Sequence, residues 1–193
     1  RRADGDAATL DQVQRMLEEQ SGQAQRLIEE LDRTVRVLRG EIEIRPKRCD
    51  LAQVVDDGIA AAKSRNAPNL RIERISPAAP IGIEADPEHL SAAVEELIDN
   101  AARFAGTMPI RVELEREGDA ALVHVRDDGP GIPADRLEQL FEPFAAAESA
   151  ESGWGIGLGY VRLVASAHRG SLQAAPGPEG KGLVMTLRLP VGG

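Results

Sequence analysis

The sequence predicts an α+β fold, a two-layer sandwich in which helices cover one face of a mixed sheet. Two observations predict this class. From about residue 50 onward, stretches with apolar residues at helical spacing are interleaved with short runs in which apolar and polar residues alternate. Two of the alternating runs are separated by only a few turn residues, which is the signature of a hairpin and requires antiparallel strands.

The N-terminal part of the chain predicts one long amphipathic helix. One heptad position holds Leu10, Leu17, Ala24, Leu31 and Leu38, and its partner position holds Val13, Gln20, Leu27 and Thr34. Gln20 and Thr34 interrupt an otherwise apolar stripe, which is typical of a dimerising or docking helix. A surface helix packed on its own domain gives the same pattern. We favour the dimerising helix because the stripe is long and ends sharply.

A linker follows this helix. Gly40 ends the helical pattern, Glu41–Ile44 alternate like a short strand, and Pro46 forbids continued helix. We therefore expect three segments: a partial dimerisation-type helix at residues 1–39, a linker at 40–49 and a second domain at 50–193.

The second domain is expected to contain three helices and five strands. The predicted helices are 50–65, 86–105 and one that starts near Gly159. The predicted strands are 70–76, 81–85, 110–117, 121–128 and 183–190; the first two are expected to pair, and the next two form the hairpin. One face of the helix at 86–105 is formed by Leu90, Ala93, Val94, Leu97, Ile98 and Ala101.

Charge and composition exclude several classes of function. The net charge of −9 and the pI of about 4.9 argue against a nucleic-acid interface, since phosphate backbones require clustered Lys and Arg. The single cysteine, Cys49, cannot form an internal disulfide, which fits a reducing cytoplasm. No apolar run approaches the ~18 residues of a spanning helix. We expect a cytoplasmic chain without membrane contact, and any membrane anchor of the natural protein lies outside it.

Three polar residues follow one another along the helix at 86–105. Glu96 and Asn100 are four residues apart and therefore share a face, and Arg103 follows about one turn further. An asparagine oxygen can join water and nucleotide phosphates around Mg²⁺, and a glutamate here can activate a nucleophile. A solvated polar stripe has the same spacing.

The stretch "VRDDGPGIP" follows a predicted strand. In it, Asp127 stands two residues before Gly129 and four before Gly131. A carboxylate at this place can accept a hydrogen bond from an exocyclic amine such as that of adenine, and the glycines let a flat base approach the backbone. Asp, Gly and Pro are also the common residues of an ordinary turn.

Alternate glycines precede the last predicted helix in "GWGIGLG". Gly153, Gly155 and Gly157 can point successive backbone N–H groups toward phosphate oxygens, and the positive end of the following helix favours the same anions. The stretch is not the dinucleotide fingerprint, because the third glycine is missing, and it lacks the Lys and Ser/Thr of a P-loop. Any phosphates must therefore be held in another way.

With these stretches the chain resembles the catalytic and ATP-binding domain of bacterial sensor histidine kinases, which belong to the Bergerat-fold (GHKL) ATPases. Four signatures occur in the family's order: the N box "EELIDNAARFA", the first glycine box "DDGPGIP", the F box "FEPF" and the second glycine box "GWGIGLG". The resemblance covers roughly residues 50–190. The upstream helix resembles the second helix of a dimerisation and phosphoacceptor domain.

The resemblance implies ATP and Mg²⁺ as ligands. It implies that Asn100 coordinates Mg²⁺, that Glu96 lies at the nucleophile-activating position and that Arg103 contacts phosphate. Asp127 would bind the adenine amine. The other nucleotide-binding positions that the resemblance implies are Gly129, Gly131, Ile132, Phe144, Gly153, Gly155, Gly157 and Leu158.

The resemblance also implies transfer of the ATP γ-phosphoryl group to a histidine and its relay to a response regulator, in a homodimer formed through the N-terminal helix. The histidines of the chain are His89, His124 and His168, and none has the family's acceptor context. The chain alone is therefore not expected to phosphorylate itself.

The acidic lid keeps a second function class open. Between Phe144 and Gly153 the lid contains Glu148 and Glu151 and no Lys or Arg, and like charges near a triphosphate oppose binding. The alternative is a degenerate kinase or an anti-sigma-like module that binds a partner protein in response to nucleotide. ATP-hydrolysing relatives such as gyrase fit less well, because nothing here resembles their transducer domain. Trp154 is expected to plug the base of the lid rather than to stack on the nucleotide base.

Overall fold

The computed structural model describes residues 16, 20–22, 24, 28, 31–66, 70–77, 79–106, 108–142 and 156–192. Its strands are β1 (Lys47–Asp50), β2 (Ile72–Ile75), β3 (Gly82–Ala85), β4 (Ile110–Glu117), β5 (Ala120–Arg126), β6 (Ser171–Pro176) and β7 (Leu183–Pro190). Its helices are α2 (Leu51–Arg65), α3 (Pro87–Ala105) and α4 (Gly157–Ala167), with short 3-10 turns η1 (Ala134–Arg136), η2 (Glu138–Phe141) and η3 (Pro178–Gly180).

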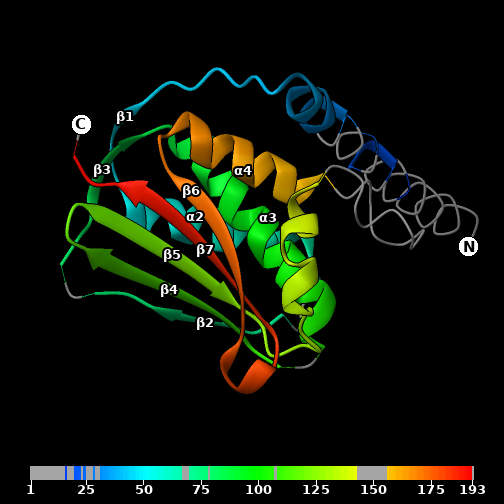
Figure 1. The fold of residues 1–193 in the computed structure, drawn as a ribbon. Coiled ribbons are helices and arrows are strands. Elements are labelled where there is room, and N and C mark those ends of the chain that lie inside the picture. The colour runs from blue at the N-terminus through cyan, green and yellow to red at the C-terminus, as the bar shows by residue number, and fades with distance from the viewer. Residues whose placement is uncertain are drawn as a thin grey trace, which may run out of the picture.

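Five strands form one mixed sheet in the order β2-β4-β5-β7-β6. β2 runs parallel to β4, and the other neighbouring pairs are antiparallel. β1 and β3 form a separate antiparallel pair. Helices α2, α3 and α4 cover one face of the large sheet (Figure 1). This arrangement confirms the predicted α+β sandwich.

The core lies between the helices and the inner face of the sheet. Alternate residues of the three central strands face it: Ile110, Val112, Leu114, Ala121, Val123, Val125, Leu183, Met185, Leu187 and Leu189. The six apolar residues predicted to share one face of α3 are all at most 3% exposed, so that prediction is confirmed. Because this face is buried, the polar residues of α3 lie along its edges.

Local sequence explains where α3 begins and ends. The Asp86 side chain accepts hydrogen bonds from the backbone N–H groups of Glu88 and His89, both at 3.1 Å, and so caps the helix. Pro87 occupies the first helical position, where a missing N–H has no cost. Gly106, with φ at 60°, follows the last turn.

The predicted pairing of the runs at 70–76 and 81–85 is wrong. Both runs contain strands, but β2 pairs with β4, and β3 pairs with β1. A parallel partner requires a long crossover connection, and α3 supplies it between β2 and β4. Although β2 and β3 are neighbours in the sequence, each therefore pairs with a different strand.

Two details of the strand prediction also differ from the structure. Residues 41–46 run along the outside of the domain without forming a strand, and the strand expected at Glu41–Ile44 begins instead at Lys47 (Figure 1). β6 was not predicted, because "SLQAAP" alternates weakly. It lies at the sheet edge, where its terminal Pro176 is tolerated.

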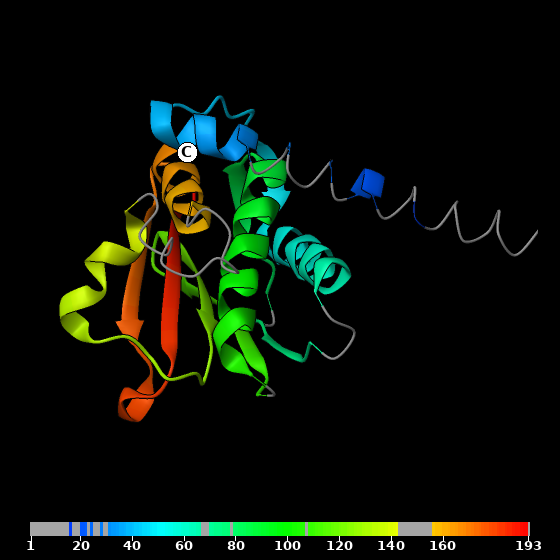
Figure 2. The same cartoon turned by 90° about the vertical axis from the view of Figure 1, so that its right-hand side faces the viewer.

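The upstream helix packs on the α+β sandwich through an unexpected residue, Thr34. Residues 31–39 are helical and lie beside the start of α4 (Figure 2). Thr34, which interrupts the predicted stripe, is only 5% exposed, whereas Leu31 and Leu38 are 57% and 61% exposed. The Thr34 face therefore meets the domain and the leucine face does not. The heptad residues Leu10, Val13, Leu17 and Leu27 lie outside the described residues.

We expect Gly182→Ala to destabilise the fold more than Gly180→Ala. Both glycines have a positive φ, 70° and 74° respectively, which costs an alanine about 1 kcal/mol or more. A Cβ at Gly180 meets nothing within 4 Å, but a Cβ at Gly182 collides with the Asp127 carbonyl oxygen. The additional loss at Gly182 should therefore be about 1–3 kcal/mol. Denaturant unfolding of both variants measures the difference, and equal losses would contradict the close approach.

Candidate functional site

Three carboxylates gather on α3, on the part of the helix that faces away from the sheet. Glu95 and Asp99 are four residues apart, and both are less than 10% exposed. Glu96 lies beside them, with a side chain that is 15% exposed. Burial of a charge is costly unless a partner compensates it, so these carboxylates require cations from other elements.

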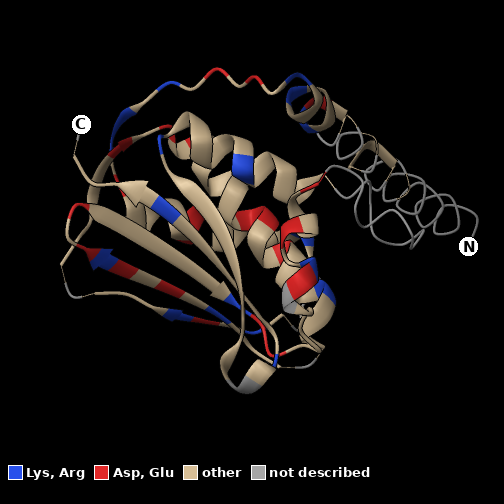
Figure 3. Cartoon of the chain, viewed as in Figure 1, with Lys and Arg blue, Asp and Glu red and all other residues tan. Residues whose placement is uncertain are grey.

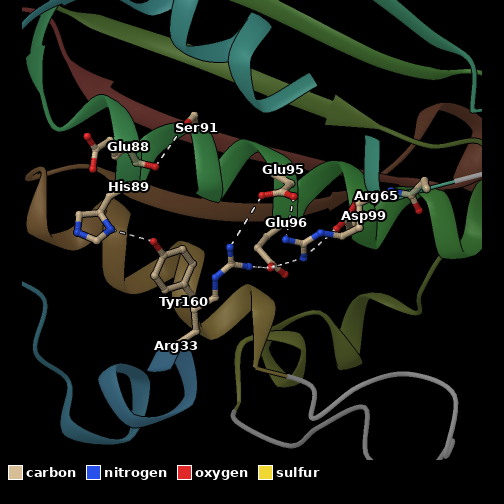
Figure 4. A network of polar contacts seen from close by, with 10 residues as sticks. Arg33, Arg65, Glu88, His89, Ser91, Glu95, Glu96, Asp99 and Tyr160 are labelled. Carbon is tan, nitrogen blue, oxygen red and sulfur yellow. Dashed lines mark hydrogen bonds and ion pairs between the residues drawn. The ribbon is translucent and has the colours of Figure 1, made fainter. Parts of the chain in front are cut away.

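The end of α2 supplies one of these cations. The Arg65 guanidinium lies 3.0 Å from a Glu95 oxygen and 3.7 Å from an Asp99 oxygen. The neighbouring Asn66 amide donates to Asp99 at 2.5 Å. Figure 4 shows Arg65 beside the carboxylates of α3. The contacts fix the C-terminal end of α2 against the middle of α3.

The upstream helix supplies the second cation. Arg33 forms an ion pair and hydrogen bond with Glu96 and lies 3.9 Å from Glu95 (Figure 4). Its guanidinium also lies over the Tyr160 ring, 5.2 Å from the ring centre. The Tyr160 hydroxyl is hydrogen-bonded to Nδ1 of His89 at 2.9 Å. Glu96 is thus located where α3, α4 and the upstream helix meet.

Burial raises the pKa of the Glu96 carboxyl, and the nearby Asp99 acts in the same direction. Arg33 opposes this effect most strongly, followed by Arg65 and Arg103. Burial likewise raises the pKa values of Glu95 and Asp99. A carboxylate with a raised pKa is a better proton acceptor near neutral pH, and such groups are common at catalytic sites.

Asn100 and Arg103 continue along α3 from Glu96. Asn100 is half-buried one turn further, on the same side of the helix as Glu96. Arg103 is exposed and lies in the last turn, close enough to lower the pKa values of Glu96 and Asp99. The structure therefore brings together the three polar residues singled out from the helical spacing.

The loop after β5 holds a buried carboxylate. Asp127 is 4% exposed, and its Oδ1 accepts a hydrogen bond from the Gly129 backbone at 2.8 Å. Burial raises its pKa. Gly129 packs so closely on the end of α3 that a Cβ there would lie 2.6 Å from the Phe104 carbonyl oxygen. Gly131 has φ at 73°, which only glycine adopts readily.

The turn between β6 and β7 supports this loop from the other side. The Gly182 backbone N–H donates to the Gly129 carbonyl oxygen at 2.8 Å, and the Asp127 backbone N–H donates to the Leu183 carbonyl oxygen at 3.1 Å. Sequence reasoning did not include this turn. Its glycine spacing, at 177, 180 and 182, was the available signal.

The second glycine stretch is described only in part. Phe144, Gly153, Gly155, Trp154, Glu148 and Glu151 lie outside the described residues. Helix α4 starts at Gly157, two residues before the predicted start, and a Cβ at Gly157 would collide with the Glu96 carboxylate. Leu158 is 8% exposed, and Ile132 packs partly buried against the core.

The three histidines make hydrogen bonds within the fold. His89 contacts Tyr160, as described above, and His124 lies 3.0 Å from the Thr186 hydroxyl. His168 is buried; its Nε2 accepts from the Asp86 backbone and its Nδ1 lies 2.8 Å from the Val164 carbonyl oxygen. His168 is therefore neutral, with its proton on Nδ1, and ties the end of α4 to the start of α3.

Two features are absent from the described ranges. These ranges contain no group of three or more His, Cys, Asp or Glu side chains arranged to hold a metal ion. None of their helices combines the length and the apolar character needed to cross a membrane.

Comparison with known proteins defines the class. Residues 85–193 match the family described as histidine kinase-, DNA gyrase B-, and HSP90-like ATPase, and the chain belongs to this family. Within the family, it is similar to sensor histidine kinases. It is 34% identical to the signal transduction histidine-protein kinase AfsQ2 of Streptomyces coelicolor over 85% of its length, and 40% identical to the sensor histidine kinase GtrS of Pseudomonas aeruginosa over 54%.

Solved structures agree with this placement. The mycobacterial sensor histidine kinase MprB matches with a TM-score of 0.66 and 26% identity, over 76% of this chain and 97% of that one. The full-length ShkA structure in complex with AMPPNP has the same fold, with a TM-score of 0.74 at 20% identity, over 86% of this chain and 36% of that one. The chain spans only 21% of GtrS and 30% of AfsQ2.

We expect Arg33→Ala to raise the pKa of Glu96 further. The substitution removes the strongest opposing charge, while burial and Asp99 remain. NMR titration of carbon-13-labelled glutamate carboxyls, with Glu96→Gln for assignment, measures the change. Arg36→Ala is the matched control, because Arg36 lies on the same helix but pairs with Asp32 at 2.7 Å. A Glu96 pKa that does not rise in Arg33→Ala would contradict the assigned role of Arg33.

Proposed function

We propose that this chain is the catalytic core of a sensor histidine kinase, which binds Mg·ATP and transfers the γ-phosphoryl group to a histidine outside the chain. The observation that carries the proposal is the placement of two carboxylates along α3: partly buried Glu96 at its middle and buried Asp127 beside its last turn. Asp127 lies beside Phe104, and Glu96 lies eight residues earlier, about 12 Å along the helix. This separation suits a ligand with a base at one end and phosphates at the other.

At the base end, Asp127 would accept a hydrogen bond from the adenine amine. Gly129 lets the loop approach the Phe104 carbonyl and the Asp127 carboxylate closely, and Gly131, with its positive φ, packs against Gly182, so the two glycines shape the loop beside the base. Ile132 would contribute apolar contact beside them. The backbone N–H groups at the start of α4 would favour the phosphates at the other end.

The residues beside Glu96 suit a bound Mg²⁺ ion. Asn100 offers one neutral oxygen, half-buried one turn from Glu96, and Mg²⁺ usually takes its remaining ligands from water and phosphate oxygens. Bound Mg²⁺ would neutralise charge on the phosphates. The carboxylates Glu95 and Asp99 are paired with Arg65 and would not be its ligands.

In the transfer step, one imidazole nitrogen of the acceptor would attack the γ-phosphorus while the bond to the ADP oxygen breaks. Glu96 would orient the imidazole and take the proton from its other nitrogen, a role that suits a raised pKa. Arg103 would neutralise phosphate charge. Positioning and charge neutralisation account for most of the acceleration in such reactions. Since Arg33 is paired with Glu96, the two must separate before Glu96 can act.

We also propose that the natural protein is a homodimer that passes its phosphoryl group to a response regulator. Four apolar residues on the upstream helix follow a three-four-three spacing and are at least 39% exposed: Ile28, Leu31, Val35 and Leu38. This spacing is that of a coiled-coil seam, which supports pairing with a second copy. A cytoplasmic location, with any membrane anchor outside this chain, is part of the same proposal.

We expect Asp127→Asn to weaken Mg·ATP binding by about tenfold or more, because a charged hydrogen bond to the adenine amine is lost. Calorimetric titration measures the affinity, and the fluorescence of Trp154, the only tryptophan, provides a second signal. Asp135→Asn is the control, since Asp135 is exposed and lies eight residues further along. Absence of binding to the wild-type chain at millimolar nucleotide would refute the kinase proposal and leave a scaffold without the chemistry.

We expect Glu96→Gln to reduce phosphoryl transfer by about 100-fold or more while leaving nucleotide affinity within a few-fold, because the proton acceptor is lost. The assay supplies a separate acceptor domain that carries the histidine and measures acid-labile phosphate. Glu88→Gln tests an exposed glutamate of the same helix and should transfer normally. Without the supplied acceptor, the chain should incorporate no phosphate. Equal rates for the two glutamine variants would exclude Glu96 as the activating group.

A further inference from the structure

Two arginines lie directly opposite each other on the outer face of the sheet. Arg111 of β4 and Arg126 of β5 are register partners. Both strands turn their alternate residues, including Val112 and Val125, into the core, so the two arginines point to the side that the helices leave open. Like charges at directly opposed positions destabilise a sheet, so this pair requires an anion between its members.

Asp128 is that anion. One carboxylate oxygen accepts from Arg126 at 2.7 Å, and the other lies 3.4 Å from Arg111. Arg111 has a second partner, Glu73 of β2, at 3.3 Å. β4, which carries Arg111, shows acidic and basic residues along its length in Figure 3. The Asp128 side chain is 17% exposed, less than either arginine, so the bridge is partly shielded from water.

Arg126 depends on this bridge. Its Nε is buried and has no hydrogen-bond partner within the part of the chain that the structure describes. One of its terminal nitrogens forms the ion pair with Asp128, at 2.7 Å. Loss of Asp128 would leave the two opposed guanidinium groups without the carboxylate that bridges them, and Glu73, which is exposed, pairs with Arg111.

The bridge distinguishes two chemically identical neighbours. Successive residues of an extended chain point to opposite faces, so Arg126 and Asp128 face outward and Asp127 faces inward. Asp127 is accordingly 4% exposed and bonded to the Gly129 backbone. A slip of one residue would exchange the two carboxylates and place Asp128 inside. The arginine pair lies on the outer face of the sheet and forms ion pairs with Asp128, so it favours the register in which Asp128 faces outward.

We propose that Arg111 and Arg126 are positioning residues of the adenine site: by holding Asp128 on the outer face, they fix Asp127 as the carboxylate that faces the base, and so set the preference for a base with an exocyclic amine. This inference rests on the proposed function, because it presupposes that Asp127 binds adenine. The two arginines do not touch the nucleotide, and they act only through the Asp128–Asp127 segment.

The arginine pair also has an electrostatic effect on the site. The Asp128 carboxylate acts to raise the pKa of its neighbour Asp127, in addition to the larger effect of burial. Cations that surround Asp128 on the outer face reduce its influence across the loop. The same contacts therefore fix the direction of Asp127 and help to keep it ionised.

The test compares ATP with purine riboside triphosphate, which is ATP without the 6-amino group, by calorimetry on the 193-residue chain. Wild type should prefer ATP by about tenfold or more, the value of one hydrogen bond to a charged group. Asp128→Asn should lower this preference at least about threefold, mainly by weakening ATP. The double variant Arg111→Gln/Arg126→Gln should have the same effect, which guards against misfolding of either variant alone.

Arg188→Gln is the matched control, because Arg188 lies on the same outer face and pairs with Glu117 at 2.9 Å, away from the loop. It should retain the wild-type preference. If Asp128→Asn and the double variant weaken both nucleotides equally, or leave the preference intact, the positioning role is overturned. If wild type and Asp127→Asn bind both nucleotides with the same affinity, the proposed function fails at its adenine contact, and this inference falls with it.

Discussion

The burial of three carboxylates on α3 is the constraint on which the packing of α2 and the upstream helix beside α3 depends. A helix that presents Glu95, Glu96 and Asp99 to a packed environment is stable only if cations arrive from elsewhere. Arg65 at the end of α2 supplies one of these cations, and Arg33 of the upstream helix supplies the other. The carboxylates thereby determine which segments can pack beside α3, while its apolar face determines how α3 sits on the sheet.

α3 joins the two halves of the candidate site because it is straight and long. Its middle carries Glu96 against the start of α4, and its last turn meets the glycine-rich loop at Phe104. The loop is in turn held by the β6–β7 turn on one side and by an arginine bridge on the other. In a site of this kind, loops are held in place by one helix, and binding residues commonly lie on loops that a rigid scaffold positions.

The sequence predicted the fold class, α2, α3, the hairpin and β7, because their periodicity is strong and local. It also singled out Glu96, Asn100, Arg103 and Asp127 as candidate site residues, because their spacing follows from helix geometry or from a turn. The partners of β2 and β3 and the positions of Arg33 and Arg65 could not be predicted, because they depend on contacts between distant segments. The burial of Thr34 against the domain could not be predicted either, since a polar residue in a heptad does not reveal which surface will bury it.

The position of Tyr160 gives the chain an internal optical reporter. It is the only tyrosine, its ring lies under the Arg33 guanidinium, and burial raises its pKa to about 12, so the phenol stays protonated throughout the neutral range. Its near-ultraviolet signal therefore contains no contribution from ionisation and none from another tyrosine. Departure of the upstream helix from the domain would change the surroundings of this one ring, so the movement could be followed without an added label.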